Sequence, residues 1–228
     1  MNYTNLKKIF ELGRPILNDS EFPYIHFAYK FNKQNYRLIT SGELLIRGKD
    51  LDIPQFLIQF MSFHNEAVMI ANIIEDKVIS IVFRSTDKNK EFIKVGTTKS
   101  SFYGLGELSK DFKYGTPIVL VEGHLDRDMM ATIYPNTLGI MTSHLSKSQI
   151  KILNYLTNKF ILMLDNDEAG REGQKSAKYQ LKGNKLMELV HYNKLKDAGD
   201  LVKLDITNHN LYEDIILDYT TQINLFLA

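Results

Sequence analysis

The sequence predicts an α/β protein in which a parallel sheet, covered by helices on both faces, follows a smaller α+β subdomain. After Pro117, short apolar runs alternate with helix-length amphipathic stretches, an alternation that is typical of parallel sheets. Before Pro117, two β-rich runs flank a short polar turn and follow a helical pattern. The chain has 228 residues and 44% hydrophobic content, enough to bury one good core or two small ones.

The change of pattern near residues 114–117 sets the expected domain boundaries. We expect a basic α+β subdomain over residues 1–115, a parallel-sheet domain over 116–205 and a C-terminal helix over 206–228. The expected helices lie at 52–63, 125–134, 146–158, 169–181 and 211–226, and the expected strands at 67–74, 78–84, 118–121, 138–141, 160–164 and 185–190. Ser146 and Gln149 have the spacing of a capping box. Residues 1–65 yield no functional prediction.

The composition excludes several kinds of site. The chain has no cysteine, which removes disulfides, cysteine nucleophiles and thiolate zinc sites. Its six histidines lack the close paired spacing of a zinc helix, so oxygen-bound Mg²⁺ or Mn²⁺ is the expected metal and zinc is not. No apolar run approaches the ~20 residues that cross a bilayer. We therefore expect a cytoplasmic protein without a membrane partner, located in the bacterial host if a phage encodes it.

Acidic residues follow three of the predicted strands directly. Glu122 and Asp126 follow the first, Asp165 and Asp167 the third, and Asp197 and Asp200 lie beyond the fourth. Ligands of open parallel sheets gather at the carboxyl ends of the strands. Each acidic group alone has a plain reading as a turn, a helix cap or a solvated loop. Their occurrence at successive strand ends indicates a shared site.

Crowded carboxylates repel one another and favour protonation, and a divalent cation removes that penalty. Magnesium completes its shell with waters and substrate phosphates, so the pattern suits phosphoryl transfer with two ions. A second feature points to phosphates, because residues 77–113 carry eight basic and four acidic side chains. An ordinary solvated face explains that segment equally well from composition alone.

Two segments resemble the Toprim signature of bacterial-type primases, type IA and type II topoisomerases and certain nucleases. These are EGHLD at residues 122–126 and LDNDEAG at 164–170. Three further segments are similar to the primase version: the run 77–84 that ends in a basic residue, KSSFYGL at 99–105, and KDAGD at 196–200. The resemblance covers about residues 66–205. It implies a Toprim-type parallel sheet in a primase catalytic core.

The resemblance also implies roles for single residues. Glu122 would be the metal-organising acid or general base, with Asp165 and Asp167 as metal ligands. Asp126 and Asp197 would be supporting ligands of a second ion. The residues that would hold template or incoming triphosphate are Arg84, Lys94 and Lys99, for which the plain reading of the two lysines is a surface position.

The sequence also departs from the primase pattern. Gly199 stands where the family has an acid or amide two places after Asp197, so the second ion depends on whether Asp200 replaces that ligand. The turn Thr142-Ser143 is a loose match to the family's glycine-threonine turn. No cysteine-rich zinc module and no helicase are present, and little follows of the helical bundle of cellular primases.

The leading interpretation is a minimal DNA primase, a nucleotidyltransferase that makes short RNA primers on a single-stranded DNA template from ribonucleoside triphosphates. Its expected partners include a replicative helicase or a separate template-reading subunit. Two alternatives stay open from the sequence. The same acids serve Toprim nucleases, and a catalytically weakened primase-like protein could keep the fold to bind a replication partner.

Overall fold

The computed structural model describes residues 2–16, 33–188, 196, 197, 200 and 221, without the side chains of 187 and 188. The chain divides into two compact units, residues 1–98 and 99–228. The expected C-terminal helix lies outside the described residues, apart from one position. No helix in the described ranges is long and apolar enough to cross a membrane.

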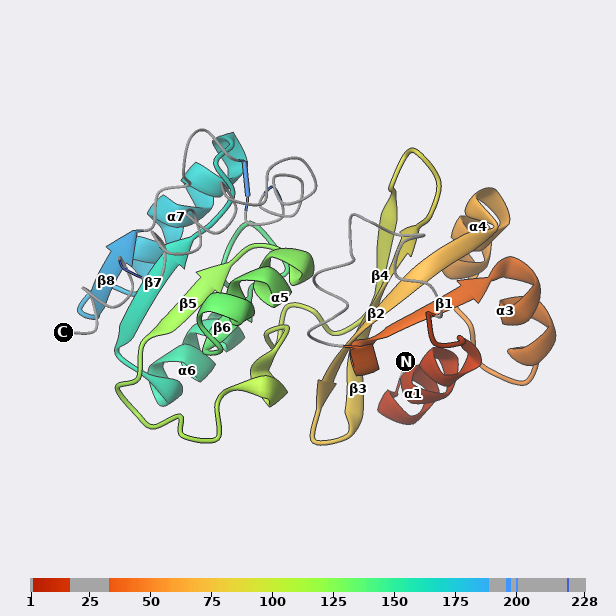
Figure 1. The fold of residues 1–228 in the computed structure, drawn as a ribbon, viewed down its shortest axis with the longest axis horizontal. Helices are drawn as coiled ribbons and strands as arrows, with labels where there is room; N and C mark the ends of the chain where they lie inside the picture. The colour runs from red at the N-terminus through yellow and green to blue at the C-terminus, as the bar shows by residue number, and fades with distance from the viewer. Residues whose placement is uncertain (1, 17–32, 189–195, 198–199, 201–220, 222–228) are drawn as a thin grey trace. The chain divides into compact units, whose positions relative to one another are not determined.

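The first unit is an antiparallel sheet with helices (Figure 1). Its strands follow the order β1-β2-β3-β4. They are β1 (Tyr36–Thr40), β2 (Glu66–Ile74), β3 (Lys77–Ser85) and β4 (Phe92–Gly96), and the helices are α1 (Tyr3–Leu12), α3 (Ser41–Arg47), α4 (Gln55–His64) and the 3-10 turn η2 (Lys33–Asn35). Apolar side chains of α1, α3 and α4 pack with those of β2 and β3 in one core, so this unit has the predicted α+β character.

The hairpin predicted around the Glu75-Asp76-Lys77 turn is confirmed. Strands β2 and β3 pair antiparallel from Ala67 opposite Ser85 to Ile74 opposite Lys77. Glu75 and Asp76 have φ angles of 48° and 60°. Positive φ at both central residues is typical of the two-residue hairpin turn whose twist matches that of the strands.

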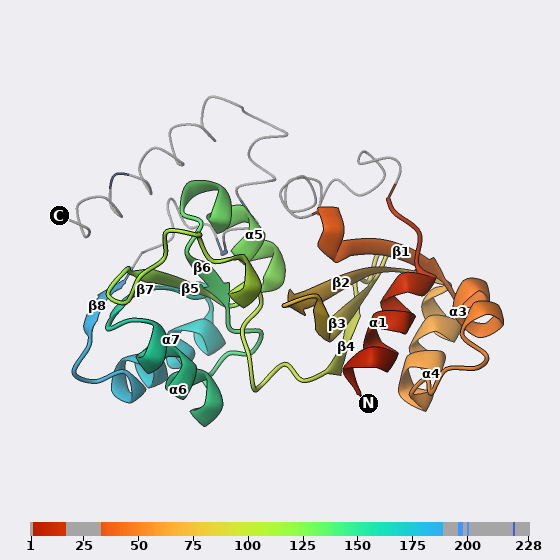
Figure 2. The ribbon, with the colours of Figure 1, turned by 90° about the horizontal axis from the view of Figure 1, so that it is seen from below.

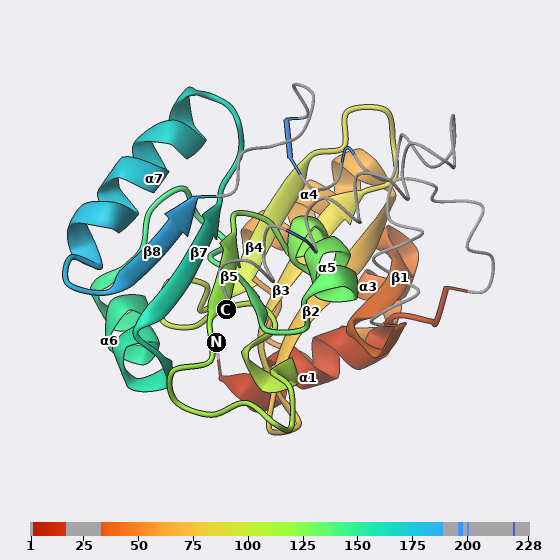
Figure 3. The same ribbon diagram turned by 60° about the vertical axis from the view of Figure 1, so that its left-hand side comes forward.

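The second unit is a four-stranded parallel sheet in the order β6-β5-β7-β8. Its strands are β5 (Ile118–Val121), β6 (Thr137–Gly139), β7 (Lys159–Met163) and β8 (Lys185–Glu188), and its helices are α5 (His124–Ile133), α6 (Lys147–Leu156), α7 (Glu168–Gln180) and the 3-10 turn η3 (Leu105–Glu107). Helix α5 lies on one face of the sheet and α6 and α7 on the other (Figures 2 and 3). The predicted fold class is therefore confirmed.

Local signals explain why these elements start where they do. The capping box predicted at Ser146 is present, since Ser146 accepts a hydrogen bond from the Gln149 amide and Gln149 accepts one from the Ser146 amide. Strands β5 and β7 are buried on both sides, as expected for the centre of a covered parallel sheet. The core on the α6 and α7 face includes Leu120, Leu153 and Leu162.

Residues 99–115 lie in the second unit, whereas the sequence placed them with the first. The reason is a backbone contact at the edge of the parallel sheet. Tyr103 and Gly139 exchange two hydrogen bonds of 3.0 Å, so the segment pairs antiparallel with β6. The side chain of Gln149 donates to the carbonyl of Ser101 at 2.8 Å and fixes the same segment to α6.

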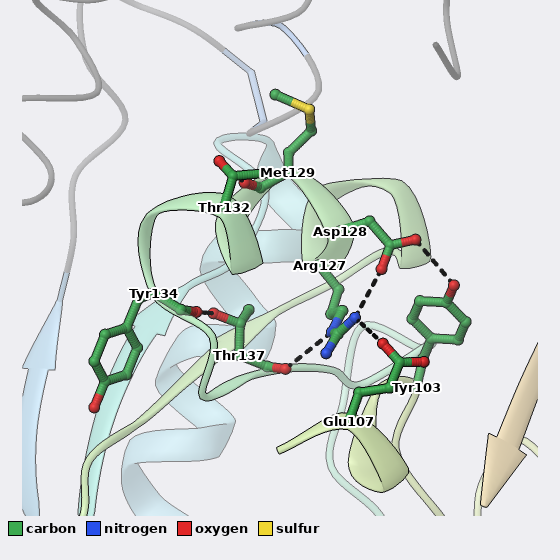
Figure 4. Close-up of polar contacts among 8 residues, drawn as sticks. All are labelled: Tyr103, Glu107, Arg127, Asp128, Met129, Thr132, Tyr134 and Thr137. Atoms are coloured by element: carbon green, nitrogen blue, oxygen red, sulfur yellow. Dashed lines mark hydrogen bonds and ion pairs between the residues drawn. The ribbon is translucent and has the colours of Figure 1, made fainter. Parts of the chain in front are cut away.

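A buried polar network ties this segment to α5 (Figure 4). Asp128 is fully buried and accepts hydrogen bonds from the Tyr103 hydroxyl at 2.9 Å and from Arg127 at 2.8 Å. Arg127 also pairs with Glu107 and donates to the Thr137 carbonyl. Burial disfavours the charge on Arg127, but Glu107 and Asp128 outweigh this effect and raise its pKa.

Gly104 makes room for that network. Its φ angle is 85°, and a Cβ atom placed on it would lie 2.2 Å from Nε of Arg127. A side chain at this position would therefore suffer both backbone strain and a collision with the guanidinium group. This explains why glycine follows Tyr103 in a segment that must pack against Arg127.

We predict that Asp128→Ala lowers the free energy of unfolding by about 3 kcal/mol, because it leaves the buried guanidinium of Arg127 with one carboxylate fewer. Tyr103→Phe removes only one hydrogen bond from the same carboxylate and should cost about 1 kcal/mol. Urea denaturation followed by circular dichroism measures both. Equal costs for the two substitutions would contradict the assignment of Asp128 as the centre of the network.

Candidate functional site

The switch point of the parallel sheet lies between β5 and β7. These neighbouring strands run in register, with Val121 opposite Met163. The chain leaves β5 toward α5 on one face of the sheet and leaves β7 toward α7 on the other (Figure 2). Ligands of open α/β sheets bind at this crevice. Glu122 follows one strand and Asp165 the other, so the fold brings both to the same edge.

Glu122 lies half-buried in the turn between β5 and α5. Its Oε2 atom is shielded from solvent, and its carbonyl accepts a hydrogen bond of 2.9 Å from the Met141 amide after β6. Met141 has a φ angle of 62°, a sparsely populated conformation for a residue with a side chain. The carbonyl contact therefore holds the end of β6 beside Glu122.

Asp126 belongs to the same turn. It lies in the first turn of α5, and a Cβ atom placed on Gly123 would lie 2.4 Å from its Oδ2. The carboxylate of Asp126 therefore folds back over Gly123, next to Glu122 in the chain. The helix N-terminus also favours a negative charge here.

Asp165 and Asp167 lie in the turn between β7 and α7. Asp167 is the N-cap of α7 and accepts a hydrogen bond of 2.9 Å from the Gly170 amide through Oδ1, which leaves its Oδ2 to other partners. The side chain of Asp165 is 18% exposed and that of Asp167 is 45% exposed. Asp167 therefore caps α7 with one carboxylate oxygen and adds negative charge to the turn with the other.

Gly170 lets α7 approach this turn. A Cβ atom on it would lie 2.0 Å from the Asp165 carbonyl oxygen and 2.9 Å from the Asp165 nitrogen. Both contacts are with backbone atoms, which cannot rotate away. Gly173, one turn later, meets the Ser143 carbonyl in the same way at 2.1 Å. The two glycines therefore place α7 directly against two of the loops at the carboxyl edge.

The third acidic segment lies against the Asp165–Asp167 turn. The Asn166 amide donates to the Lys196 carbonyl at 2.7 Å. Asp200 accepts from the Lys196 amide through Oδ2 at 2.8 Å, and its own amide donates to Oδ1 of Asp197 at 2.9 Å. In this arrangement Asp197 and Asp200 each use one carboxylate oxygen to close the local turn.

Lys196 brings a positive charge to the pair of aspartates. Its Nζ lies 3.6 Å from Oδ2 of Asp165 and 3.8 Å from Oδ2 of Asp167. Burial disfavours the ammonium form, but the carboxylates of Asp165, Asp197 and Asp167 outweigh it and raise the pKa of Lys196. The two predicted metal ligands therefore converge on one cation.

The residues present suit a divalent metal ion. The donors are carboxylate oxygens, which Mg²⁺ and Mn²⁺ prefer, and the ammonium of Lys196 shows that the two Oδ2 atoms can share one cation. No three Asp, Glu or His side chains among the described residues gather closely enough to form a complete metal site. Magnesium is commonly held by one or two carboxylates, with water and substrate phosphates completing its shell.

The three predicted basic residues fall in both units. On paired strands of the first unit, Arg84 lies opposite Phe92 and Val82 opposite Lys94, so Arg84 and Lys94 share a face of that sheet. Lys99 lies in the second unit, where its carbonyl accepts a hydrogen bond from the Ser146 side chain at the start of α6. Helix α6 begins after the loop that follows β6. Lys99 therefore lies near the carboxyl edge of the sheet, which also carries the acids.

Sequence reasoning missed Lys196, Gly170 and Gly173 as site residues. Lys196 is the first residue of the KDAGD segment. The charges of that segment do not indicate which side chain from another part of the chain the lysine will contact. The glycine of the motif was the available signal, since glycine after an N-cap aspartate marks a helix start that must approach another backbone closely.

We predict that Gly170→Ala disturbs the Asp165–Asp167 turn without removing a carboxylate, because the new methyl group meets backbone atoms of Asp165. Mn²⁺ affinity, measured by isothermal titration, should fall by about tenfold or more, as expected for misplaced support of a metal site. Gly42→Ala in α3 is the matched control, since a Cβ atom there meets nothing within 4 Å. Unchanged Mn²⁺ affinity in Gly170→Ala would show that the close approach is dispensable.

Comparison with known proteins is consistent with this geometry. Residues 119–202 match a Toprim-like family model. No curated protein matches the chain. Among solved structures, the Aquifex aeolicus primase (zinc-binding and RNA polymerase domains) has a TM-score of 0.69 and 18% identity, covering 95% of this chain and 60% of that one.

Two further primases share the fold. The primase fragment of the bacteriophage T7 primase-helicase has a TM-score of 0.51 and 21% identity over 65% of this chain and 62% of its own. A DnaG primase catalytic domain bound to single-stranded DNA has a TM-score of 0.64 and 16% identity over 95% and 80%. The chain thus spans about three fifths of the Aquifex and T7 structures. Residues 119–202 form a Toprim-like domain, and the chain has the fold of bacterial and phage primase catalytic cores.

Proposed function

We propose that the chain is a minimal DNA primase core, which synthesises short RNA primers on single-stranded DNA by metal-dependent nucleotidyl transfer. The observation that carries the proposal is the convergence of Asp165 and Asp167 on one cation at the switch point of the sheet, with Glu122 directly after the neighbouring strand. The likeness of the fold to primase catalytic cores supports the proposal.

The carboxylates have distinct tasks in this proposal. Asp165 and Asp167 would hold the first ion, and Asp126 and Asp197 would support a second. Asp200 closes the turn through its hydrogen bond with the Lys196 amide, and it contributes to the second ion in place of Gly199. Glu122 organises the ions or takes the proton of the attacking 3′ hydroxyl. When bound, Mg²⁺ or Mn²⁺ would supply the positive charge that favours attack by that hydroxyl and departure of pyrophosphate.

The basic residues hold the nucleic acid and the nucleotide. Arg84 and Lys94 share one sheet face, so they contact successive phosphates of the template or the triphosphate of the incoming ribonucleotide. Lys99 does so from the edge that carries the acids. The DnaG domain that shares this fold is bound to single-stranded DNA, which supports a DNA template here.

The proposed partners follow from the same likeness. One structure with this fold is part of a phage primase-helicase, and we propose a helicase or a separate template-reading subunit as the partner of this chain. The site of action is then the cytoplasm, in a bacterial host if the chain is encoded by a phage.

Primer synthesis by the purified protein tests the proposal. With single-stranded template, ribonucleoside triphosphates and Mg²⁺ or Mn²⁺, labelled oligoribonucleotides should form. Glu122→Gln should reduce their rate by about 100-fold or more, as expected for loss of a catalytic acid–base group. Glu75→Gln, in the exposed turn between β2 and β3, removes the same charge from a turn that carries none of the proposed metal ligands and should leave the rate unchanged.

The same assay separates joining from cutting, because Toprim acids can direct either a 3′ hydroxyl or water. Labelled DNA and RNA incubated with metal but without nucleotides should stay intact. Cleavage that depends on Glu122, with no primer formed, would assign the chain to the nucleases. Absence of both activities in the presence of a helicase partner would leave a binding role and overturn the proposal.

A further inference from the structure

The Lys196 backbone makes one hydrogen bond to the acidic turn and one within its own turn. The Asn166 amide donates to the Lys196 carbonyl at 2.7 Å, and the Lys196 amide donates to Asp200 at 2.8 Å. The Lys196 backbone is thus fixed on both sides of its Cα atom. Its side chain starts beside the two aspartates because of these bonds and not because of the ion pair alone.

The ammonium group of Lys196 lies close to the carboxylates of both Asp165 and Asp167, which carry charges of the same sign. It is 3.6 Å from Asp165 and 3.8 Å from Asp167, so it reduces their mutual repulsion. The Lys196 side chain is nevertheless 57% exposed. Such a side chain can move into solvent at low cost, since exposed ion pairs contribute little to stability.

We propose that Lys196 is a built-in counter-ion of Asp165 and Asp167 that competes with the divalent metal for their Oδ2 atoms. The inference rests on the proposed function, because it takes these two aspartates as metal ligands. A metal ion that binds both Oδ2 atoms must displace the ammonium from them. Lys196 therefore weakens metal binding and keeps the turn ordered until metal and substrate phosphates arrive together.

The turn of Lys196, Asp197 and Asp200 therefore has a second proposed role, which is to present a positive charge to the first pair of acids. Asp197 and Asp200 use carboxylate oxygens within their own turn, and that turn presents Lys196 to the first pair of acids. After displacement the ammonium stays tethered at the carboxyl edge, where it is placed to meet the phosphates of a nucleotide. The segment would then exchange one anionic partner for another as the substrate binds.

Direct titration with Mn²⁺, in the absence of nucleotide and template, tests the competition. Lys196→Met keeps much of the side-chain length but removes the charge, and we expect it to bind Mn²⁺ about two- to fivefold more tightly than the wild type. Lys196→Arg keeps the charge and should stay close to the wild type. Calorimetry and the electron paramagnetic resonance signal of free Mn²⁺ give independent affinities.

Lys151→Met is the matched control for net charge. Lys151 is exposed on α6, and its loss changes the net charge by the same unit without touching the aspartates. An equal gain in affinity from Lys151→Met would show a general charge effect and overturn the inference. Unchanged or weaker binding by Lys196→Met would overturn it too, since a competitor's removal must tighten binding.

A second measurement keeps the outcomes distinct. In chelator, Lys196→Met should lower the unfolding midpoint, and Asp165→Asn in the same chain should restore part of the loss because it removes the like-charge repulsion. The proposed function fails by a different result: Mn²⁺ binding that is insensitive to Asp165→Asn and Asp167→Asn, or absent from the wild type. If the aspartates do bind Mn²⁺ and Lys196→Met has no effect, only the counter-ion role is lost.

Discussion

Repulsion between Asp165 and Asp167 is the constraint on which the rest of the site depends. Two carboxylates in one turn, both within 4 Å of the same ammonium nitrogen, repel one another unless a positive charge lies beside them. The contacts around the turn place a positively charged side chain beside it. A hydrogen bond from the Asn166 amide holds the Lys196 backbone against the turn, and the Lys196 side chain supplies the charge. The two aspartates therefore face one cation before any divalent ion binds.

Close packing of backbones makes this crowding achievable. Gly170 and Gly173 let α7 touch the backbone after β7 and the loop after β6, and Met141 accepts a left-handed conformation to bond the Glu122 carbonyl. These contacts leave little freedom for the strand ends that carry the acids. The site is therefore positioned by main-chain geometry, which is more rigid than side-chain contacts alone.

The sequence predicted the parallel sheet well because its signals are local. Buried apolar strands such as β5, the capping box at Ser146 and the glycine-containing turn after β7 each depend on near neighbours in the chain. Contacts between distant segments were not predictable in this way. The pairing of Tyr103 with Gly139 moved residues 99–115 into the second unit. The pairing of Lys196 with Asp165 was not predicted, because the two residues are distant in the sequence and nothing local indicates which acid a loop lysine will meet.

The two polar clusters of the second unit show why site and scaffold are built differently. Arg127 and Asp128 are almost fully buried and make hydrogen bonds to fixed partners. Removal of one partner leaves a buried charge without compensation, which is strongly destabilising. Lys196 and Asp167 are about half exposed, and solvent replaces whatever partner leaves. A charge that must be exchanged during turnover belongs in the second environment. A charge that must hold the edge strand and α5 together belongs in the first.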